Sequence, residues 1–133
     1  MENIIAITIK QYLKENVSNY VIYRGGLPLD GSKVKSDGVS FTKDIEIGKY
    51  WAGSVVGGKL YKYKLSDNAN ILTSDNFPER IKPKERPYGH QDKERIVNYA
   101  LVKGYDGVDL SSYFNESEIR IFKLDVINQI FPA

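Results

Sequence analysis

Apolar residues recur along the chain at two spacings, and each spacing predicts a different secondary structure. Residues 60–65 place lysines on one face and tyrosines on the other, which is typical of a half-buried strand. Short runs rich in β-branched and aromatic residues predict further strands at 20–24, 39–42, 107–110 and 116–122. Apolar residues at helical spacing predict helices over 3–15, between Thr42 and Gly57, and over 92–103.

The second predicted helix carries its own start and stop signals. Thr42 precedes it and can cap its first turn, because a threonine hydroxyl accepts from the free backbone amides there. Asp44 and Glu46 follow, and their negative charges suit the positive end of the helix dipole. The pair Gly57 and Gly58 is expected to end the helix.

Three segments between these elements have the composition of loops, namely 27–38, 74–90 and 111–115. The 74–90 segment is the longest and holds Pro78, Pro83 and Pro87. Loops of this length inside a compact domain are usually functional or mobile. Substrate choice, if the protein is an enzyme, is therefore expected to depend on these loops.

The length and composition favour one globular domain over residues 1–133. A chain of 133 residues with 41% hydrophobic and 27% charged residues is within the usual range for such a domain. No apolar stretch approaches the about 18 residues that span a bilayer. The first residues also lack the basic start and cleavage site of a signal peptide. We therefore expect the protein to act in a cytoplasm, its own or that of a host, and not at a membrane.

Several classes of chemistry are excluded by the residues that the chain lacks. It has no cysteine, which removes disulfides, thiolate metal sites and cysteine nucleophiles. With His90 as the single histidine, a histidine-rich metal site is impossible. We therefore expect no metal. A net charge of +2 is too small to imply a nucleic-acid partner by itself.

Two glutamates one residue apart, Glu116 and Glu118, open the predicted strand at 116–122. Side chains two positions apart on a strand point to the same face, so these carboxylates are expected to project together. Like charges side by side on one face repel, so stability alone would rarely select them. The simplest interpretation is a solvated strand edge that discourages aggregation. The segments upstream favour another interpretation.

Three short motifs stand in a suggestive order: Tyr23-Arg24-Gly25, Ser40-Phe41-Thr42 and Glu116-Ser117-Glu118. This order resembles the arginine–serine–glutamate class of the ADP-ribosyltransferase superfamily, especially its small bacterial and phage members. Tyr50-Trp51-Ala52 and residues 103–108 are also similar to connecting segments of that family. The resemblance implies an α+β fold in which two small packed sheets, flanked by helices, surround an NAD cleft.

The resemblance also implies a role for each motif. Glu118 would stabilise the positive charge that develops on the ribose when the nicotinamide bond breaks. Arg24 would bind the pyrophosphate with its planar fork of donors, and Ser40 would orient Glu118 and the nicotinamide ribose. Thr42 would support the strand and cap the helix. Glu116 would contact the acceptor, with arginine as the favoured acceptor side chain.

The full set of expected site residues is larger than these. The catalytic residues implied are Glu118 and Glu116, and the NAD-binding residues implied are Tyr23, Arg24, Gly25, Ser40, Phe41, Thr42 and Tyr50. The co-substrate implied is NAD, and the second partner implied is a target macromolecule, with protein favoured over nucleic acid. Ser40-Phe41-Thr42 departs from the fuller Ser-Thr-Ser pattern of the family.

Each motif also has an ordinary structural interpretation. Arg24 can be a strand-end arginine in a surface ion pair, and Ser40 and Thr42 can serve only as helix caps. Tyr50 is better suited to a core position than to stacking on a ligand. His90 is expected to be a solvated loop residue.

An alternative function follows from the basic residues of the 74–90 segment. Arg80, Lys82, Lys84 and Arg86 lie close together there, and such a cluster can dock an acidic protein or nucleic acid. In that case the protein would be a non-enzymatic inhibitor or binding module.

Overall fold

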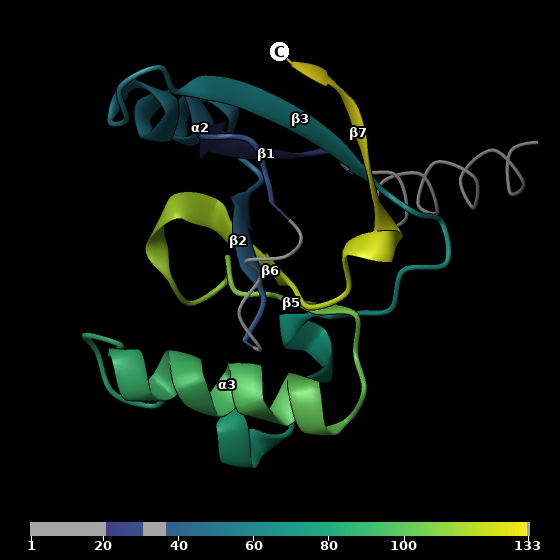
Figure 1. Ribbon diagram of the computed structural model, residues 1–133. Helices are drawn as coiled ribbons and strands as arrows, with labels where there is room; N and C mark the ends of the chain where they lie inside the picture. The colour runs from purple at the N-terminus through teal and green to yellow at the C-terminus, as the bar shows by residue number, and fades with distance from the viewer. Residues whose placement is uncertain (1–20, 31–36, 133) are drawn as a thin grey trace, which may run out of the picture.

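The computed structural model describes residues 21–30 and 37–132 of the chain (Figure 1). The helix predicted over 3–15 lies outside the described residues. Within them, the chain forms one mixed sheet with two α-helices, so the predicted α+β class is confirmed.

Seven strands form the sheet in the part of the chain that the structure describes. Their order is β4-β5-β6-β2-β1-β3-β7, and every neighbouring pair is antiparallel except β4 and β5, which are parallel. The strands are β1 (Val21–Gly26), β2 (Val39–Thr42), β3 (Lys59–Leu65), β4 (Ile71–Leu72), β5 (Gly107–Asp109), β6 (Glu118–Ile121) and β7 (Ile127–Pro132).

The helices are α2 (Ile45–Gly53) and α3 (His90–Val102). Figure 1 shows α2 beside β1 and β3, with α3 at the opposite end of the molecule. Short 3-10 turns occupy parts of the loops: η2 (Ser74–Asn76), η3 (Glu79–Ile81), η4 (Asn115–Ser117) and η5 (Leu124–Val126). The 74–90 loop is fixed to the domain, because Phe77 and Ile81 are buried in the core beneath α3.

The pairing of β2 with β6 separates an apolar face of the sheet from a polar one. Phe41 pairs with Ile119, and both belong to a core cluster that continues onto β3 and β7. Thr42 pairs with Glu118 in the same register, and paired residues point to the same side of a sheet. The central strands thus present hydrophobic residues on one side and hydroxyl and charged residues on the other.

Both helices pack on the face that carries Thr42. In α2, Gly48 lies against Tyr23, Thr42 and Leu60. In α3, the buried side chains share a core cluster with Val108, which pairs with Arg120 of β6. The two helices cover the two ends of this face, and the polar residues of β2 and β6 lie between them.

The start of α2 differs from the prediction. Asp44, and not Thr42, is the N-cap, because its carboxylate accepts the Glu46 amide at 2.9 Å. The Thr42 hydroxyl instead accepts the Asp44 amide at 3.1 Å. The helix also ends at Gly53, earlier than predicted, because the Ser54 amide closes a tight turn onto the Trp51 carbonyl.

Strand β1 continues through Gly25 and Gly26, two residues beyond the strand predicted at 20–24. Gly25 pairs with Leu60 and touches α2, so a methyl group there would meet the Gly48 carbonyl oxygen at 2.0 Å. These are backbone atoms, which cannot move aside as a flexible side chain would. Glycine at position 25 therefore allows α2 to pack closely on β1.

We predict that Gly25→Ala lowers the free energy of unfolding by about 1–3 kcal/mol, the usual cost of overpacking. Urea denaturation of the purified variant measures this change. Gly53→Ala is the matched control, because a methyl group at Gly53 meets no atom of the described residues within 4 Å and alanine favours the helix. Equal stability of the two variants would contradict the packing argument.

Candidate functional site

The carboxylate of Glu118 is the centre of the candidate site. Ser40 Oγ donates to Glu118 Oε2 at 2.6 Å from the neighbouring strand. Lys93 Nζ reaches Oε1 at 2.8 Å from α3, and Arg120 donates to Oε2 at 2.9 Å from the same strand. Glu118 is only 6% exposed, so three partners surround an almost buried charge.

Burial and hydrogen bonding act on this carboxyl in opposite directions. Burial raises the pKa of Glu118. The hydrogen bonds from Lys93 and Ser40 and the charge of Arg120 lower this pKa, and their combined effect is larger than that of burial. The net effect holds the pKa below its ordinary value. Glu118 is therefore ionised at neutral pH, and its orientation is fixed from three directions.

Sequence reasoning missed two of these partners, Lys93 and Arg120. The sequence pattern could have predicted Arg120, because a residue two positions after Glu118 on a strand shares its face. No sequence pattern could have predicted Lys93, since only the packing of α3 against the sheet brings it near β6. Its ammonium group also lies 5.2 Å from the centre of the Phe114 ring.

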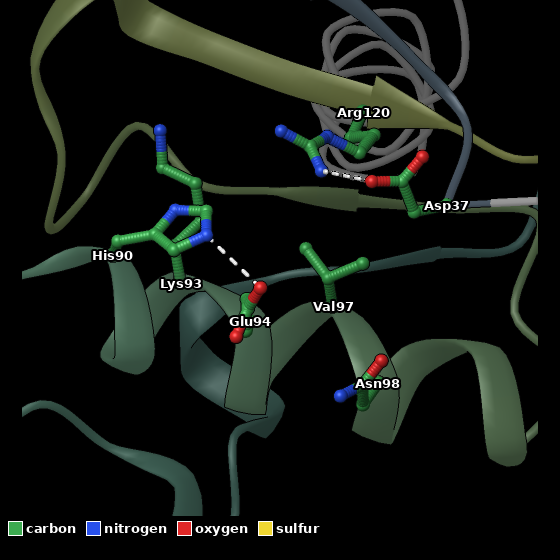
Figure 2. Close-up of a pocket in the computed structure, with 7 residues that line it drawn as sticks. All are labelled: Asp37, His90, Lys93, Glu94, Val97, Asn98 and Arg120. Carbon is green, nitrogen blue, oxygen red and sulfur yellow. Dashed lines mark ion pairs between the residues drawn. The ribbon is translucent and has the colours of Figure 1, made fainter. Parts of the chain in front are cut away.

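A cleft of about 700 Å³ opens between α3, Arg120 of β6 and Asp37, which precedes β2. Figure 2 shows residues of α3 along one wall and Arg120 with Asp37 across from them. The walls carry both signs of charge, and ion pairs join Arg120 to Asp37 and His90 to Glu94. Lys93 and Arg120 line the cleft and also bind Glu118, so they connect the two. A volume of this size is in the range of small-molecule sites.

Glu116 lies outside β6, which corrects the prediction that both glutamates project from one strand. The strand begins at Glu118, and Glu116 belongs to the preceding turn η4. Its φ of 72° is in the left-handed region, as is the φ of 49° at Ser117. This turn breaks the alternation on which the prediction rested. Glu116 is exposed, whereas Glu118 is buried.

Arg24 lies on the other face of the sheet from Ser40. It pairs with Tyr61 of the apolar core, and its neighbour Tyr23 pairs with Thr42 on the polar face. The guanidinium still reaches across the strand, where NH1 donates to the Ser40 carbonyl oxygen at 3.4 Å. Arg24 Nε is buried without a hydrogen-bond partner among the residues that the structure describes. Ser40 and Glu118 are thus brought into contact, but Arg24 and Glu118 are not.

The other residues expected to bind NAD have varied positions. Phe41 is fully buried and packs edge-on against Tyr63 with ring centres 5.3 Å apart. Tyr23 and Gly25 face α2, and the Tyr50 ring is 74% exposed on the helix surface. Phe41 and Gly25 thus have packing roles.

The basic residues of the 74–90 loop are partly engaged with neighbours. Lys82 forms an ion pair with Glu79 at 2.8 Å, and Arg80 lies over the Tyr99 ring. Arg86 lies over Tyr88 in the same way. His90 is the first residue of α3 rather than a loop residue, and its side chain is largely exposed, as predicted.

Comparison with known proteins adds no relative. No protein-family model, curated protein or solved structure matches this chain. Across residues 21–30 and 37–132, no three carboxylate or histidine side chains lie together as a metal site would require. No helix in this part of the chain is long and apolar enough to cross a membrane.

We predict that Lys93→Met lowers the free energy of unfolding by about 1.5–3 kcal/mol at pH 7, the usual worth of a hydrogen bond to a charged group. The lowered pKa of Glu118 makes its ionised form stabilising at pH values above its ordinary pKa of 4.5. That contribution is lost as the pH falls through the lowered pKa, so the difference between variant and parent should shrink in acid. Denaturation at pH 7 and at about pH 3 tests this sign.

Lys49→Met serves as the control for this measurement. Lys49 forms an ion pair with Glu46 at 3.3 Å, but both side chains are more than half exposed. Exposed pairs of this kind contribute little, so the substitution should change stability by under about 0.5 kcal/mol at either pH. A Lys93→Met effect as small as the control would mean that Glu118 does not depend on Lys93.

Proposed function

We propose that the protein is a mono-ADP-ribosyltransferase that transfers ADP-ribose from NAD to a target macromolecule. The hydrogen bond of 2.6 Å between Ser40 Oγ and Glu118 Oε2 carries this proposal. The resemblance of the sequence to the arginine–serine–glutamate class implies that Ser40 orients Glu118. The adjacency of β6, β2 and β1, which hold the three motifs, further supports it.

The state of Glu118 suits the chemistry of this reaction. The bond between ribose C1′ and the nicotinamide nitrogen breaks, and nicotinamide leaves as a neutral molecule with the bonding electrons. The ribose then carries positive charge, which a fixed and ionised carboxylate stabilises. Ser40 and Arg120 make three hydrogen bonds to Oε2 of Glu118, whereas Oε1 accepts one, from Lys93, among the described residues. Because each carboxylate oxygen has about two acceptor positions, Oε1 is the oxygen proposed to accept the ribose 2′-hydroxyl.

The cleft between α3 and Arg120 is the proposed NAD site. Arg120 and Lys93 bring two cations to its wall, and both suit a pyrophosphate. Arg24 lies on the other face of the sheet from this cleft, so in this proposal Lys93 and Arg120 take the pyrophosphate contact that was expected of Arg24. In this proposal the single curled sheet of seven strands takes the place of the two smaller packed sheets that the family resemblance implies.

The acceptor is expected near Glu116, which is exposed on the turn that precedes β6. A guanidinium acceptor must lose a proton as its nitrogen attacks C1′, and an exposed carboxylate can orient it and take that proton. We therefore propose an arginine side chain of a protein as the acceptor, modified in a cytoplasm. Water in place of that side chain would give NAD hydrolysis.

We expect Glu118→Gln to lower nicotinamide release and labelling about 10²–10³-fold, because the amide cannot offset the charge on the ribose. The assay incubates the protein with NAD labelled in its adenosine part and a cell extract, with release measured separately. Glu85→Gln, an exposed loop substitution, is the control. Activity that is absent from the parent protein, or equal in the Glu118 variant, would refute the proposal.

For Glu116→Gln we expect labelling and nicotinamide release to respond differently, because Glu116 is proposed to contact the acceptor and lies outside the strand of Glu118. Labelling of the extract should fall at least about tenfold, whereas nicotinamide release without acceptor should change less than about twofold. Both rates come from the same enzyme preparation. A parallel fall in both rates would remove Glu116 from the acceptor role.

The alternative is a non-enzymatic binding module that uses the 74–90 loop. Binding of NAD distinguishes the enzyme from this alternative. NAD that binds only the folded protein raises its melting temperature by mass action. Millimolar NAD should therefore stabilise the parent protein. A null shift together with salt-dependent binding of nucleic acid would favour the alternative.

A further inference from the structure

The loop that carries Glu116 is closed at its base. Leu110 donates its backbone amide to the Glu118 carbonyl at 2.9 Å, which joins the two ends of the segment between β5 and β6. Asp109 holds the first end, because its carboxylate accepts both the amide and the hydroxyl of Ser111. The other oxygen of Asp109 forms an ion pair with Lys43 at 2.8 Å. The loop is therefore fixed to the junction between β2 and α2.

The second end of the loop holds two strained residues. Glu116 and Ser117 both have left-handed φ values, of 72° and 49°, and neither is a glycine. Such a conformation persists only where the surroundings determine it. Here the carbonyl oxygens of both residues are bound by the same junction. Thr42 Oγ1 donates to the Glu116 oxygen at 2.6 Å, and the Lys43 amide donates to the Ser117 oxygen at 3.0 Å.

The Thr42 hydroxyl is used fully in this junction. It donates its proton to the Glu116 carbonyl and accepts the Asp44 amide at 3.1 Å, so it connects the turn to the start of α2. The residue is completely buried, and its methyl group faces Gly48. A valine has the same shape but no hydroxyl, and a serine has the hydroxyl but no methyl group. The chemistry of the two replacements therefore separates anchoring from packing.

We propose that Thr42 is a positioning residue for the acceptor side of the reaction, because its hydroxyl fixes the turn that presents Glu116. This inference rests on the proposed transferase function. In this proposal each of the two hydroxyl residues of β2 positions one of the two glutamates. Ser40 binds the Glu118 side chain directly, whereas Thr42 acts on Glu116 only through the backbone of the turn.

The kinetic test compares Thr42→Val with Thr42→Ser. In the valine variant the turn loses its anchor, and labelling of a cell extract by labelled NAD should fall about 10–100-fold. Nicotinamide release in buffer without acceptor should fall at least about threefold less than labelling does. The serine variant should restore labelling to within about threefold of the parent. Equal losses of labelling and release in the valine variant, or failure of serine to rescue, would overturn the proposal.

A second measurement does not depend on activity. Hydrogen exchange of the backbone amides over residues 114–118 should become faster in Thr42→Val and stay near the parent rate in Thr42→Ser. Exchange over α3 should be the same in all three proteins, which shows that the fold is retained. Unchanged exchange over 114–118 in the valine variant would overturn the anchoring role. If the parent protein does not cleave NAD, the proposed function fails and the acceptor role with it, while exchange still decides whether Thr42 holds the turn.

Discussion

The polar half of this structure depends on one buried negative charge. A carboxylate in the position of Glu118 would be costly without partners, and the three groups around it come from three different elements. Ser40 lies on β2, Arg120 on β6 and Lys93 on α3. The charge therefore ties α3 to the centre of the sheet. It also keeps Glu118 ionised and in one orientation, the two properties that charge stabilisation in a reaction requires.

Neighbouring residues on or beside the polar face of the sheet make different kinds of contact. Ser40 and Thr42 are two positions apart and point the same way, yet one binds a side chain and the other binds a backbone oxygen. Glu116 and Glu118 differ in a similar manner. One is exposed on a strained turn, and the other is buried at the start of a strand. Such an arrangement can hold the charge of Glu118 rigidly and leave Glu116 accessible to a second reactant.

The fold could be predicted from local patterns wherever one face of an element is buried. The alternation over residues 60–65 located β3, and the helical spacing before Gly104 located α3 to within two residues. Predictions were wrong where two local preferences compete. Thr42 and Asp44 can both cap α2, and the aspartate does so because its carboxylate accepts the Glu46 amide, whereas the threonine hydroxyl accepts the amide of Asp44 itself. Likewise, an x-Glu-x-Glu run allows a strand, but the anchors on the turn hold Glu116 outside it.

The sequence by itself determined the α+β class, the main strands and helices, and the candidate contact between Ser40 and Glu118. The class and the elements follow from periodicity, which is a local property, whereas the contact was implied by the family resemblance of the motifs. The tertiary structure decided that Lys93 and Arg120 complete the carboxylate site and that Arg24 lies across the sheet from it. It also decided that Glu116 stands on a left-handed turn. Strand register and helix packing fix these relations. They join residues such as Lys93 and Glu118, which lie 25 positions apart and which no local pattern connects.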